Sequence, residues 1–388
     1  LLALTAAIAP GSVAFAQNTP LIQPEILVTV QKREQDLRDV PINLTALSGE
    51  LLSDLGLEEF DALSRFTPGF VVQEQSVNNP GFVMRGITSD SGEATTEPRV
   101  AVFQDGVSIS KSRGSIVELF DVERVEIAKG PQATLFGRGA LIGGVNVIQN
   151  KADFDLSYKA TLGAGNFGEV FAEGIANIPF LEDKFAARLA MRYKRRDGYV
   201  ESANPREDDF NGTDMAAVRL ALRLDADEAL RFDVIFNYQK DTPPGTAFKS
   251  GSFLPTPGGS LAPWEAANLN TFGGFEDGRA LGIDRTVTGL TVLADWDLGE
   301  GYNLNAILAY REFESLEIFD PDGFGLPLFV FAEDAYGEQY SNELRLSYDE
   351  GEDFAWFVGA SWLLEEGFQR VPLLFDERAT QALLAGPG

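Results

Sequence analysis

The chain has 388 residues, of which 59 are acidic and 31 are basic, so its formal net charge at pH 7 is −28. That balance excludes a protein that binds nucleic acid by neutralising phosphates, because such binding needs a cationic surface. The sequence has no histidine and no cysteine. This absence excludes disulfides, zinc sites built from imidazole or thiolate, cysteine nucleophiles and serine–histidine–aspartate triads.

Residues 1–16 resemble the end of a secretory signal peptide. They read LLALTAAIAPGSVAFA, an apolar stretch broken by Pro10-Gly11 that ends in the small-x-small pattern Ala14-Phe15-Ala16. We expect cleavage before Gln17 and therefore export. A buried N-terminal helix is the alternative, since the apolar stretch is too short to span a bilayer.

Residues 17–38 are expected to form an extended arm. The region is polar around one apolar patch at residues 26–28, and it contains Pro20 and Pro24. Such a composition disfavours a packed core.

Residues 39–152 have the pattern of a small mixed α/β domain. Ser48 suits the N-cap of a helix that ends before Gly56, and Asp105-Gly106 between two apolar runs is a strong signal for a hairpin turn. The expected elements are a strand at 41–47, helices at 48–55 and 58–66, and strands at 100–104, 107–109, 122–127 and 145–148.

Residues 153–388 change to strands in which apolar and polar side chains alternate. In residues 185–196 one face carries Phe185, Ala187, Leu189, Met191 and Tyr193, and the other carries Arg188, Arg192 and Lys194. The alternation recurs at 215–224, 230–239, 302–313, 340–348 and 354–365. A soluble sandwich also alternates. Repeated strands of about 9 to 11 residues with aromatic ends, joined alternately by short and long connections, favour a barrel that spans a membrane.

Residues 122–148, VERVEIAKGPQATLFGRGALIGGVNVI, resemble the signature of the plug domain of TonB-dependent outer-membrane receptors. Matching pieces lie at 26–47, 82–87 (FVMRGI) and 102–107 (VFQDGV). The alternative for this glycine-rich run is a phosphate-binding loop, but the Gly-Lys-Ser/Thr ending is absent. The motif positions are Glu123, Arg124, Glu126, Gly130, Pro131, Gly137, Gly143, Gly144 and Asn146.

The resemblance implies a β-rich membrane protein in which a small α/β plug precedes an antiparallel transmembrane β-barrel of about twenty-two strands. Residues 153–388 offer about nine candidate strands. The barrel is therefore expected to be incomplete, and the chain to be part of a longer protein. The expected divisions are the end of the signal peptide at 1–16, the arm at 17–38, the plug at 39–152 and the N-terminal part of the barrel at 153–388.

The resemblance also implies two sites. The first is the TonB box, an extended segment that adds as a strand to the periplasmic energy-coupling protein TonB. Its matching residues are Glu25, Ile26, Leu27, Val28, Thr29 and Val30, and the alternative is a first plug strand. The second is a lock in which basic plug residues meet barrel carboxylates, with Arg85 and Lys129 at the matching positions. Because arginine is usual at the second position and lysine cannot bind a carboxylate as a bidentate fork, the lock at Lys129 is expected to be weaker.

The implied function is energised uptake of a scarce nutrient, most often a ferric siderophore, across the outer membrane of a Gram-negative bacterium. The implied partners are TonB, outer-membrane lipid and a small cargo such as a ferric chelate. No catalytic residue, resident metal, cofactor or nucleic-acid partner is expected, and the short arm implies transport without direct transcriptional signalling.

The cargo-facing parts are expected in the loops at 240–285 and 319–338 and at the plug apices 76–80 and 89–98. Cobalamin, haem, saccharides and aromatic compounds stay open as cargoes. A secreted β-rich glycosidase with two carboxylates is the alternative of another class.

Overall fold

The computed structural model gives the arrangement of most of the chain after the arm. Within the part that it describes, no helix is both long and apolar enough to cross a membrane. The expected signal peptide, Gly137 and most of the apex at 89–98 lie outside the described residues. The described residues are 27–28, 35–36, 38, 40–76, 78–88, 98–115, 118–133, 139–181, 183–202, 207–248, 280–321, 329–349, 351, 354–375, 381 and 384.

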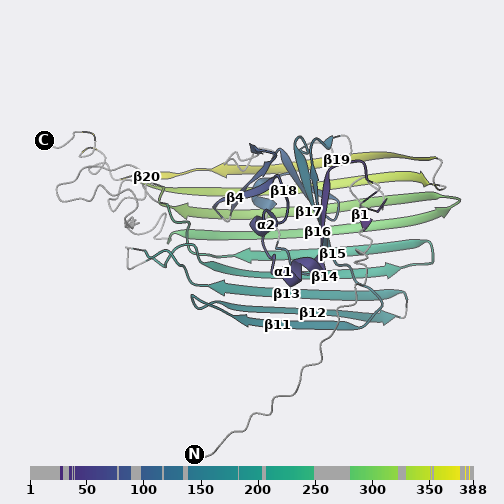
Figure 1. Cartoon of the computed structure of the whole chain (residues 1–388), viewed down its shortest axis with the longest axis horizontal. Helices are drawn as coiled ribbons and strands as arrows, with labels where there is room; N and C mark the ends of the chain where they lie inside the picture. The colour runs from purple at the N-terminus through teal and green to yellow at the C-terminus, as the bar shows by residue number, and fades with distance from the viewer. Residues whose placement is uncertain are drawn as a thin grey trace, which may run out of the picture.

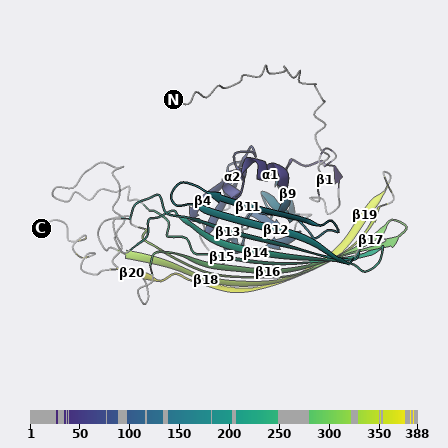
Figure 2. The same ribbon diagram turned by 90° about the horizontal axis from the view of Figure 1, so that it is seen from below.

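The second half of the chain forms one large antiparallel sheet, in which strands that follow each other in sequence also lie side by side (Figure 1). The sheet is curved, and the rest of the described chain lies on its concave side (Figure 2). Its strands are β11 (Ser157–Ala164), β12 (Val170–Leu181), β13 (Phe185–Arg196), β14 (Thr213–Asp225), β15 (Leu230–Asp241), β16 (Gly282–Gly299), β17 (Tyr302–Phe319), β18 (Phe329–Asp349), β19 (Ala355–Arg370) and β20 (Leu373–Phe375), which pairs with β18.

The connections of the large sheet differ between its two ends. At one end, turns such as residues 226–229 and 300–301 are short. At the other end the connections are mostly longer, the largest being residues 242–281 between β15 and β16. We call these the short-turn end and the long-loop end.

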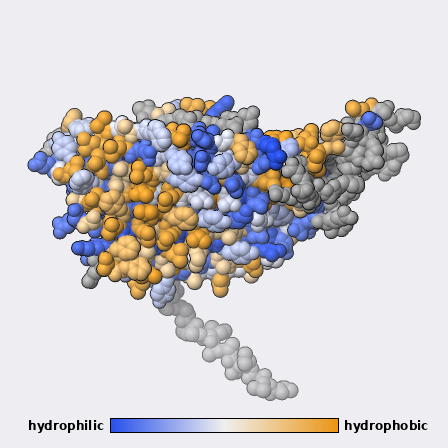
Figure 3. Space-filling view, turned by 180° about the vertical axis from the view of Figure 1, so that it is seen from behind, coloured by the Kyte–Doolittle hydropathy of each residue, from blue (hydrophilic) through white to orange (hydrophobic). Residues whose placement is uncertain are grey.

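Apolar side chains gather over broad parts of the outward face of the large sheet, with polar ones between them (Figure 3). A cross-strand row runs through Leu189, Leu220, Phe236, Leu290, Tyr310 and Tyr340. Nearer the short-turn end, the ring of Tyr348 lies 4.8 Å from that of Tyr302 and 6.2 Å from that of Trp356, between centroids. An exposed apolar band edged by aromatic rings is typical of strands that face lipid.

Residues 40–152 form the small domain on the concave side. Its five-stranded sheet has the order β3-β9-β10-β7-β8, in which only β10 and β7 are parallel. A second sheet joins β4, β5 and β6. The elements are β3 (Leu44–Ser48), α1 (Gly49–Leu55), α2 (Phe60–Leu63), β4 (Phe70–Ser76), β5 (Asn79–Met84), β6 (Ile87–Thr88), β7 (Val100–Gln104), β8 (Val107–Ile109), η2 (Ser112–Gly114), β9 (Val122–Lys129) and β10 (Gly143–Gln149).

Local signals in the small domain were interpreted correctly at several positions. The Ser48 side chain accepts a hydrogen bond from the Leu51 amide at 3.3 Å, and Gly56 ends α1 with φ = 63°. Asp105 and Gly106 both have positive φ between β7 and β8, as a two-residue hairpin turn requires. The helix expected at 58–66 is shorter and covers only Phe60–Leu63.

In the large sheet the expected strand 185–196 coincides with β13, whereas the loop expected at 319–338 is wrong in part. Strand β18 begins at Phe329, so residues 329–338 belong to a strand. Glu333 and Asp334 are adjacent acidic residues in this part of β18, so the alternation of apolar and polar side chains is interrupted there. No bounds were predicted for β11, β12 and β16.

Gly143 of β10 occupies a position with no room for a side chain. A Cβ there would lie 2.0 Å from Met84 Sδ and 2.6 Å from the Ala128 carbonyl oxygen, and φ is 157°. We therefore expect Gly143→Ala to destabilise the small domain by about 2 to 3 kcal/mol. Thermal unfolding of the full receptor in detergent would measure this. Gly144→Ala is the matched control, because its nearest neighbours would be 3.5 Å away; equal losses in both variants would contradict the prediction.

Candidate functional site

The segment that matches the TonB box is partly folded onto the small domain. Leu27–Val28 form β1, which pairs antiparallel with β2 (Gln35–Asp36). Val28 is 1% exposed and packs with Val40 and Ala128. The other members of the box, Glu25, Ile26, Thr29 and Val30, lie outside the described residues.

The two residues expected in the lock lie close together. Lys129 Nζ donates to Thr45 Oγ1 at 3.1 Å and to the Pro68 carbonyl oxygen at 3.3 Å. A Cβ on Gly130 would lie 3.5 Å from a terminal guanidinium nitrogen of Arg85, and burial together with the charge of Arg85 lowers the pKa of Lys129. Within the described residues neither side chain forms an ion pair. The two cations are therefore available to an acidic partner.

The other motif residues build the small domain itself. Arg124 Nε donates to Glu126 Oε1 at 2.8 Å, and Arg124 also contacts Glu123. The Glu126 side chain is fully buried and accepts a long hydrogen bond of 3.4 Å from Asn146 Nδ2. Gly130 has φ = 117° beside the exposed Pro131. These contacts are internal, so the motif has a structural role here.

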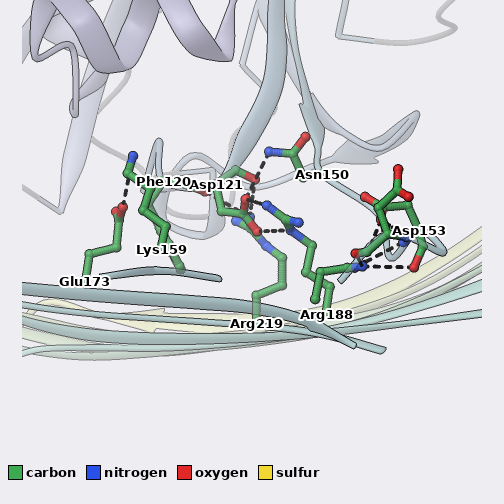
Figure 4. A network of polar contacts seen from close by, with 10 residues as sticks. Phe120, Asp121, Asn150, Asp153, Lys159, Glu173, Arg188 and Arg219 are labelled. Atoms are coloured by element: carbon green, nitrogen blue, oxygen red, sulfur yellow. Dashed lines mark hydrogen bonds and ion pairs between the residues drawn. The ribbon is translucent and has the colours of Figure 1, made fainter. Parts of the chain in front are cut away.

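One contact between the small domain and the large sheet is centred on Asp121, which the sequence did not single out (Figure 4). Asp121 accepts hydrogen bonds from Arg188 Nε at 2.8 Å and Nη2 at 2.5 Å. Arg219 Nη1 donates to the carbonyl oxygens of Phe120 and Asp121, both at 2.9 Å. Asn150 Nδ2 completes the group by donating to Asp121 Oδ1 at 2.9 Å. We call Asp121, Arg188 and Arg219 the Asp121 cluster.

A second group of ion pairs continues along β13 toward the long-loop end. Arg192 lies 2.9 Å from Glu58 and 3.7 Å from Glu118, and its guanidinium stacks over the Phe171 ring at 4.9 Å. Lys194 lies 3.0 Å from Glu58 and 3.3 Å from Glu59. Here the small domain supplies the carboxylates and the sheet supplies the cations. The sequence revealed the cationic face of β13 but not its partners.

On β17 and β18 the polarity is reversed. The fully buried Arg113 of the small domain pairs with Glu333. Ser76 Oγ donates to Glu317 at 2.8 Å, and Asn78 Nδ2 donates to the same carboxylate at 3.4 Å. The apex expected at 76–80 to face cargo therefore has two of its side chains buried against the sheet. The side chains of Ser76 and Asn78 form hydrogen bonds with Glu317 and Ser315 of β17.

Glu118 gives this interface a pH dependence. Burial raises its pKa to about 8 from the ordinary 4.5, although Arg192 and Lys194 oppose the shift; Glu59 and Asp241 add to it. Between pH 4.5 and about 8, the Glu118 carboxyl is therefore protonated in the docked domain but ionised in the unfolded chain. The free energy that holds the domain in place consequently decreases as the pH rises through this range. We expect Glu118→Gln to reduce this dependence. Protease protection of the small domain in the full receptor between pH 5 and 8, compared with wild type, would show it; an unchanged slope in the variant would contradict it.

The comparisons with known proteins agree with this arrangement. A family model described as TonB-dependent Receptor Plug Domain matches residues 36–145. The pesticin receptor of Yersinia pestis is 25% identical over 222 residues, which cover 56% of this chain and 32% of that protein. The ferripyoverdine receptor of Pseudomonas aeruginosa is 23% identical over 232 residues, covering 59% and 27%. The chain thus spans about a third of the length of these relatives.

Among solved structures, the ferric yersiniabactin uptake receptor of Yersinia pestis superposes with a TM-score of 0.73 at 17% identity, over 86% of this chain and 50% of that one. The fold is thus that of an outer-membrane β-barrel with a plug, in which the small domain is the plug and the large sheet is barrel wall. Residues 36–145 thus carry the plug domain of a TonB-dependent receptor, a class of protein of the outer membrane of Gram-negative bacteria.

Proposed function

We propose that the whole receptor imports a ferric siderophore with energy delivered by TonB. The observation that carries the proposal is a plug held against the barrel wall by buried but separable ion pairs, above all Asp121 with Arg188. Polar contacts can be broken and remade without exposing a hydrophobic core. The relatives named for pesticin and ferripyoverdine favour an iron chelate as the cargo.

The domain boundaries belong to this proposal. Residues 17–38 would be the arm, 39–152 the plug and 153–388 the first part of the barrel. Within the arm, β1 is a pairing of only two residues, Leu27 with Asp36 and Val28 with Gln35. Release of so short a strand would break few backbone hydrogen bonds but would expose the buried Val28, and its backbone would then be free to add to a strand of TonB.

The lock is proposed at Arg85 and Lys129. Arg85 is exposed with φ = 51°, and Lys129 is held beside it by Thr45 and Pro68. Two adjacent cations without a carboxylate are unfavourable, and carboxylates from further barrel strands would relieve the repulsion. The proposed pairing would hold the plug at Lys129, the last residue of β9, whereas Asp121 directly precedes the first.

Receptors of this family are transporters, and we propose no catalytic activity for this one. Iron would enter inside a chelate, so the protein needs no histidine or cysteine of its own to bind it. A β-rich glycosidase is no longer favoured, because the fold is that of a plugged barrel.

The decisive experiment follows the full-length gene in its host. Iron starvation is expected to raise its transcript, and a deletion strain is expected to lose uptake of a labelled ferric chelate that the wild type takes up. Restoration by the gene on a plasmid is the control. A transcript level that does not change with iron supply, together with unchanged uptake of ferric chelates in the deletion strain, would refute a ferric siderophore as the cargo. Cobalamin, haem, saccharides and aromatic compounds would then be tested.

A further inference from the structure

The longest connection of the large sheet, residues 242–281, begins and ends in two segments that contact each other. We call residues 243–247 the entry segment and residues 281–283 the exit segment. The Ile283 amide donates a hydrogen bond to the Pro243 carbonyl oxygen at 3.1 Å. The pairing of β15 with β16 is thus extended into the connection, and a displacement of one segment would disturb the other.

The neighbouring connection, between β13 and β14, contacts both of these segments. The Asn211 amide donates to the Gly245 carbonyl oxygen at 3.1 Å, and Asn211 Oδ1 accepts a hydrogen bond from the Ala247 amide, also at 3.1 Å. Glu207 Oε2 accepts from the Leu281 amide at 3.0 Å. Asn211 is therefore bonded to the entry segment through its backbone and through its side chain.

The residue types at positions 211 and 212 allow the entry segment to approach this closely. Asn211 has φ = 61°, in the left-handed region that asparagine and glycine tolerate better than other residues. A Cβ on Gly212 would lie 2.7 Å from Pro244 Cγ and 2.8 Å from the Arg196 carbonyl oxygen. The sequence Asn211-Gly212 therefore permits both the turn and the contact with the entry segment.

A small apolar cluster accompanies these hydrogen bonds. Phe210 is 2% exposed and belongs to one cluster with Leu281 of the exit segment, and Ala247 of the entry segment packs against it. The cluster also contains Ile318 of β17 and Ala332 of β18. Apolar packing therefore holds both segments on the barrel wall, while Asn211 supplies the directional contacts to the entry segment.

The entry segment is also linked to the plug through the carboxylate of Glu317 on β17. Thr246 Oγ1 donates to Glu317 Oε1 at 3.4 Å, and Ser76 Oγ of the plug donates to Glu317 Oε2 at 2.8 Å. Glu317 is only 2% exposed. Because the two donors share one buried carboxylate, the entry segment and the plug apex lie close together.

A cavity of about 360 Å³ lies where the plug, the entry segment and Asn211 meet. Its volume is within the range of sites that hold small organic ligands. The cavity is at the long-loop end, which faces the outside of the cell in barrels with short periplasmic turns. Its lining includes Ser76 and Pro80 of the plug, Thr246 and Ala247 of the entry segment, and Asn211.

We propose that Asn211 is a positioning residue of the cargo site, which holds the entry segment against the plug apex and thereby sets the affinity for the cargo. The proposal rests on the proposed function, because it concerns the external site of a receptor that imports a ferric chelate. Loss of the Asn211 side chain would leave the Ala247 amide without its acceptor, so the entry segment would be held less firmly. The maximal rate of uptake would not change, because the pair Asp121–Arg188 that holds the plug does not involve Asn211.

Two variants separate the side chain of Asn211 from its backbone. Glycine removes the acceptor for the Ala247 amide and aspartate keeps it, and both residues tolerate a positive φ. The probe is the siderophore purified from iron-starved cultures of the host and loaded with radioactive iron. In the full receptor on cells, Asn211→Gly is expected to weaken surface binding of this probe at least about fivefold with an unchanged maximal uptake rate. Asn211→Asp is expected to bind within about twofold of wild type.

Asn166→Gly is the matched control for the glycine variant. Asn166 is an exposed residue of the connection 165–169, at the same end of the sheet. Its replacement makes the same chemical change outside the cavity. Binding of the probe is therefore expected to equal that of wild type.

Thiol labelling gives a second readout that does not depend on the cargo, since the chain has no cysteine of its own. Ala247→Cys is expected to react with a maleimide at least about fivefold faster when combined with Asn211→Gly than when combined with Asn211→Asp. Glu228→Cys, in a short turn at the other end of the sheet, is the control. Its rate is expected to be equal in both backgrounds.

Equal binding by Asn211→Gly and wild type would overturn the positioning role, and so would equal losses in the glycine and aspartate variants. A maximal uptake rate that falls together with binding would indicate general disruption of the fold and would also overturn it. If the wild type binds no ferric siderophore but the labelling rates differ as expected, the proposed cargo fails while the positioning of the entry segment stands. If wild-type uptake is normal but neither readout responds to Asn211→Gly, the proposed function stands and the positioning role fails.

Discussion

Replacing Asp121 by alanine is expected to destabilise the docked plug by about 3 to 5 kcal/mol, the usual cost of removing one partner from a buried ion pair. The Asp121 side chain is 1% exposed and that of Arg188 is 14% exposed, so water screens the pair little. Alanine would leave the guanidinium of Arg188 buried without its carboxylate. Limited proteolysis of the plug and thermal unfolding of the full receptor would measure the loss.

A matched control lies near the short-turn end of the same barrel wall. Asp225 accepts two hydrogen bonds from Arg231, at 2.9 and 3.0 Å, but half of the Arg231 side chain is exposed. Because exposed ion pairs contribute little, Asp225→Ala is expected to cost less than about 1 kcal/mol. Similar losses in the two alanine variants would show that Asp121 does not anchor the plug.

Deleting residues 25–30 is expected to abolish energised uptake of the cargo while surface binding stays intact. The reason is that strand addition to TonB would use the backbone of this segment, and a deletion removes the whole pairing edge. Val28→Pro is a milder form of the same test, since proline lacks the amide donor and cannot pair in the middle of a sheet. Uptake of a labelled ferric chelate by energised cells and its surface binding to de-energised cells would be measured in parallel.

Removal of an equal length of the arm outside the box, residues 18–23, is the control for the deletion and is expected to retain uptake. Normal uptake after loss of residues 25–30 would refute the assignment of the TonB box. Loss of both uptake and surface binding would instead indicate that Val28, which is buried against Val40 and Ala128, is needed to fold the plug.

Elements with strong local signals were predictable from the sequence. Strand β13 has large apolar side chains on one face and cations on the other, and its bounds were predicted correctly. Helix α1 has a serine cap and a glycine stop, and both act as expected. In contrast, β18 runs for 21 residues, and only its second half, in which Leu344 and Leu346 alternate with charged and polar side chains, was predicted as a strand. Its first half, FVFAEDAYGE, has two adjacent acidic residues and a glycine, so it lacks the apolar–polar alternation that marks a strand.

The sequence by itself determined the class of protein, because alternation, turns, caps and the plug motif each depend on residues that are near one another in the chain. Only the tertiary structure decided which polar side chains hold the plug. Asp121 and Arg188 are 67 positions apart, and Ser76 and Glu317 are 241 apart. Such partners are brought together by strand register and sheet curvature, and a charged residue on the inward face of a strand has the same local pattern whether it meets a partner, a cavity or water.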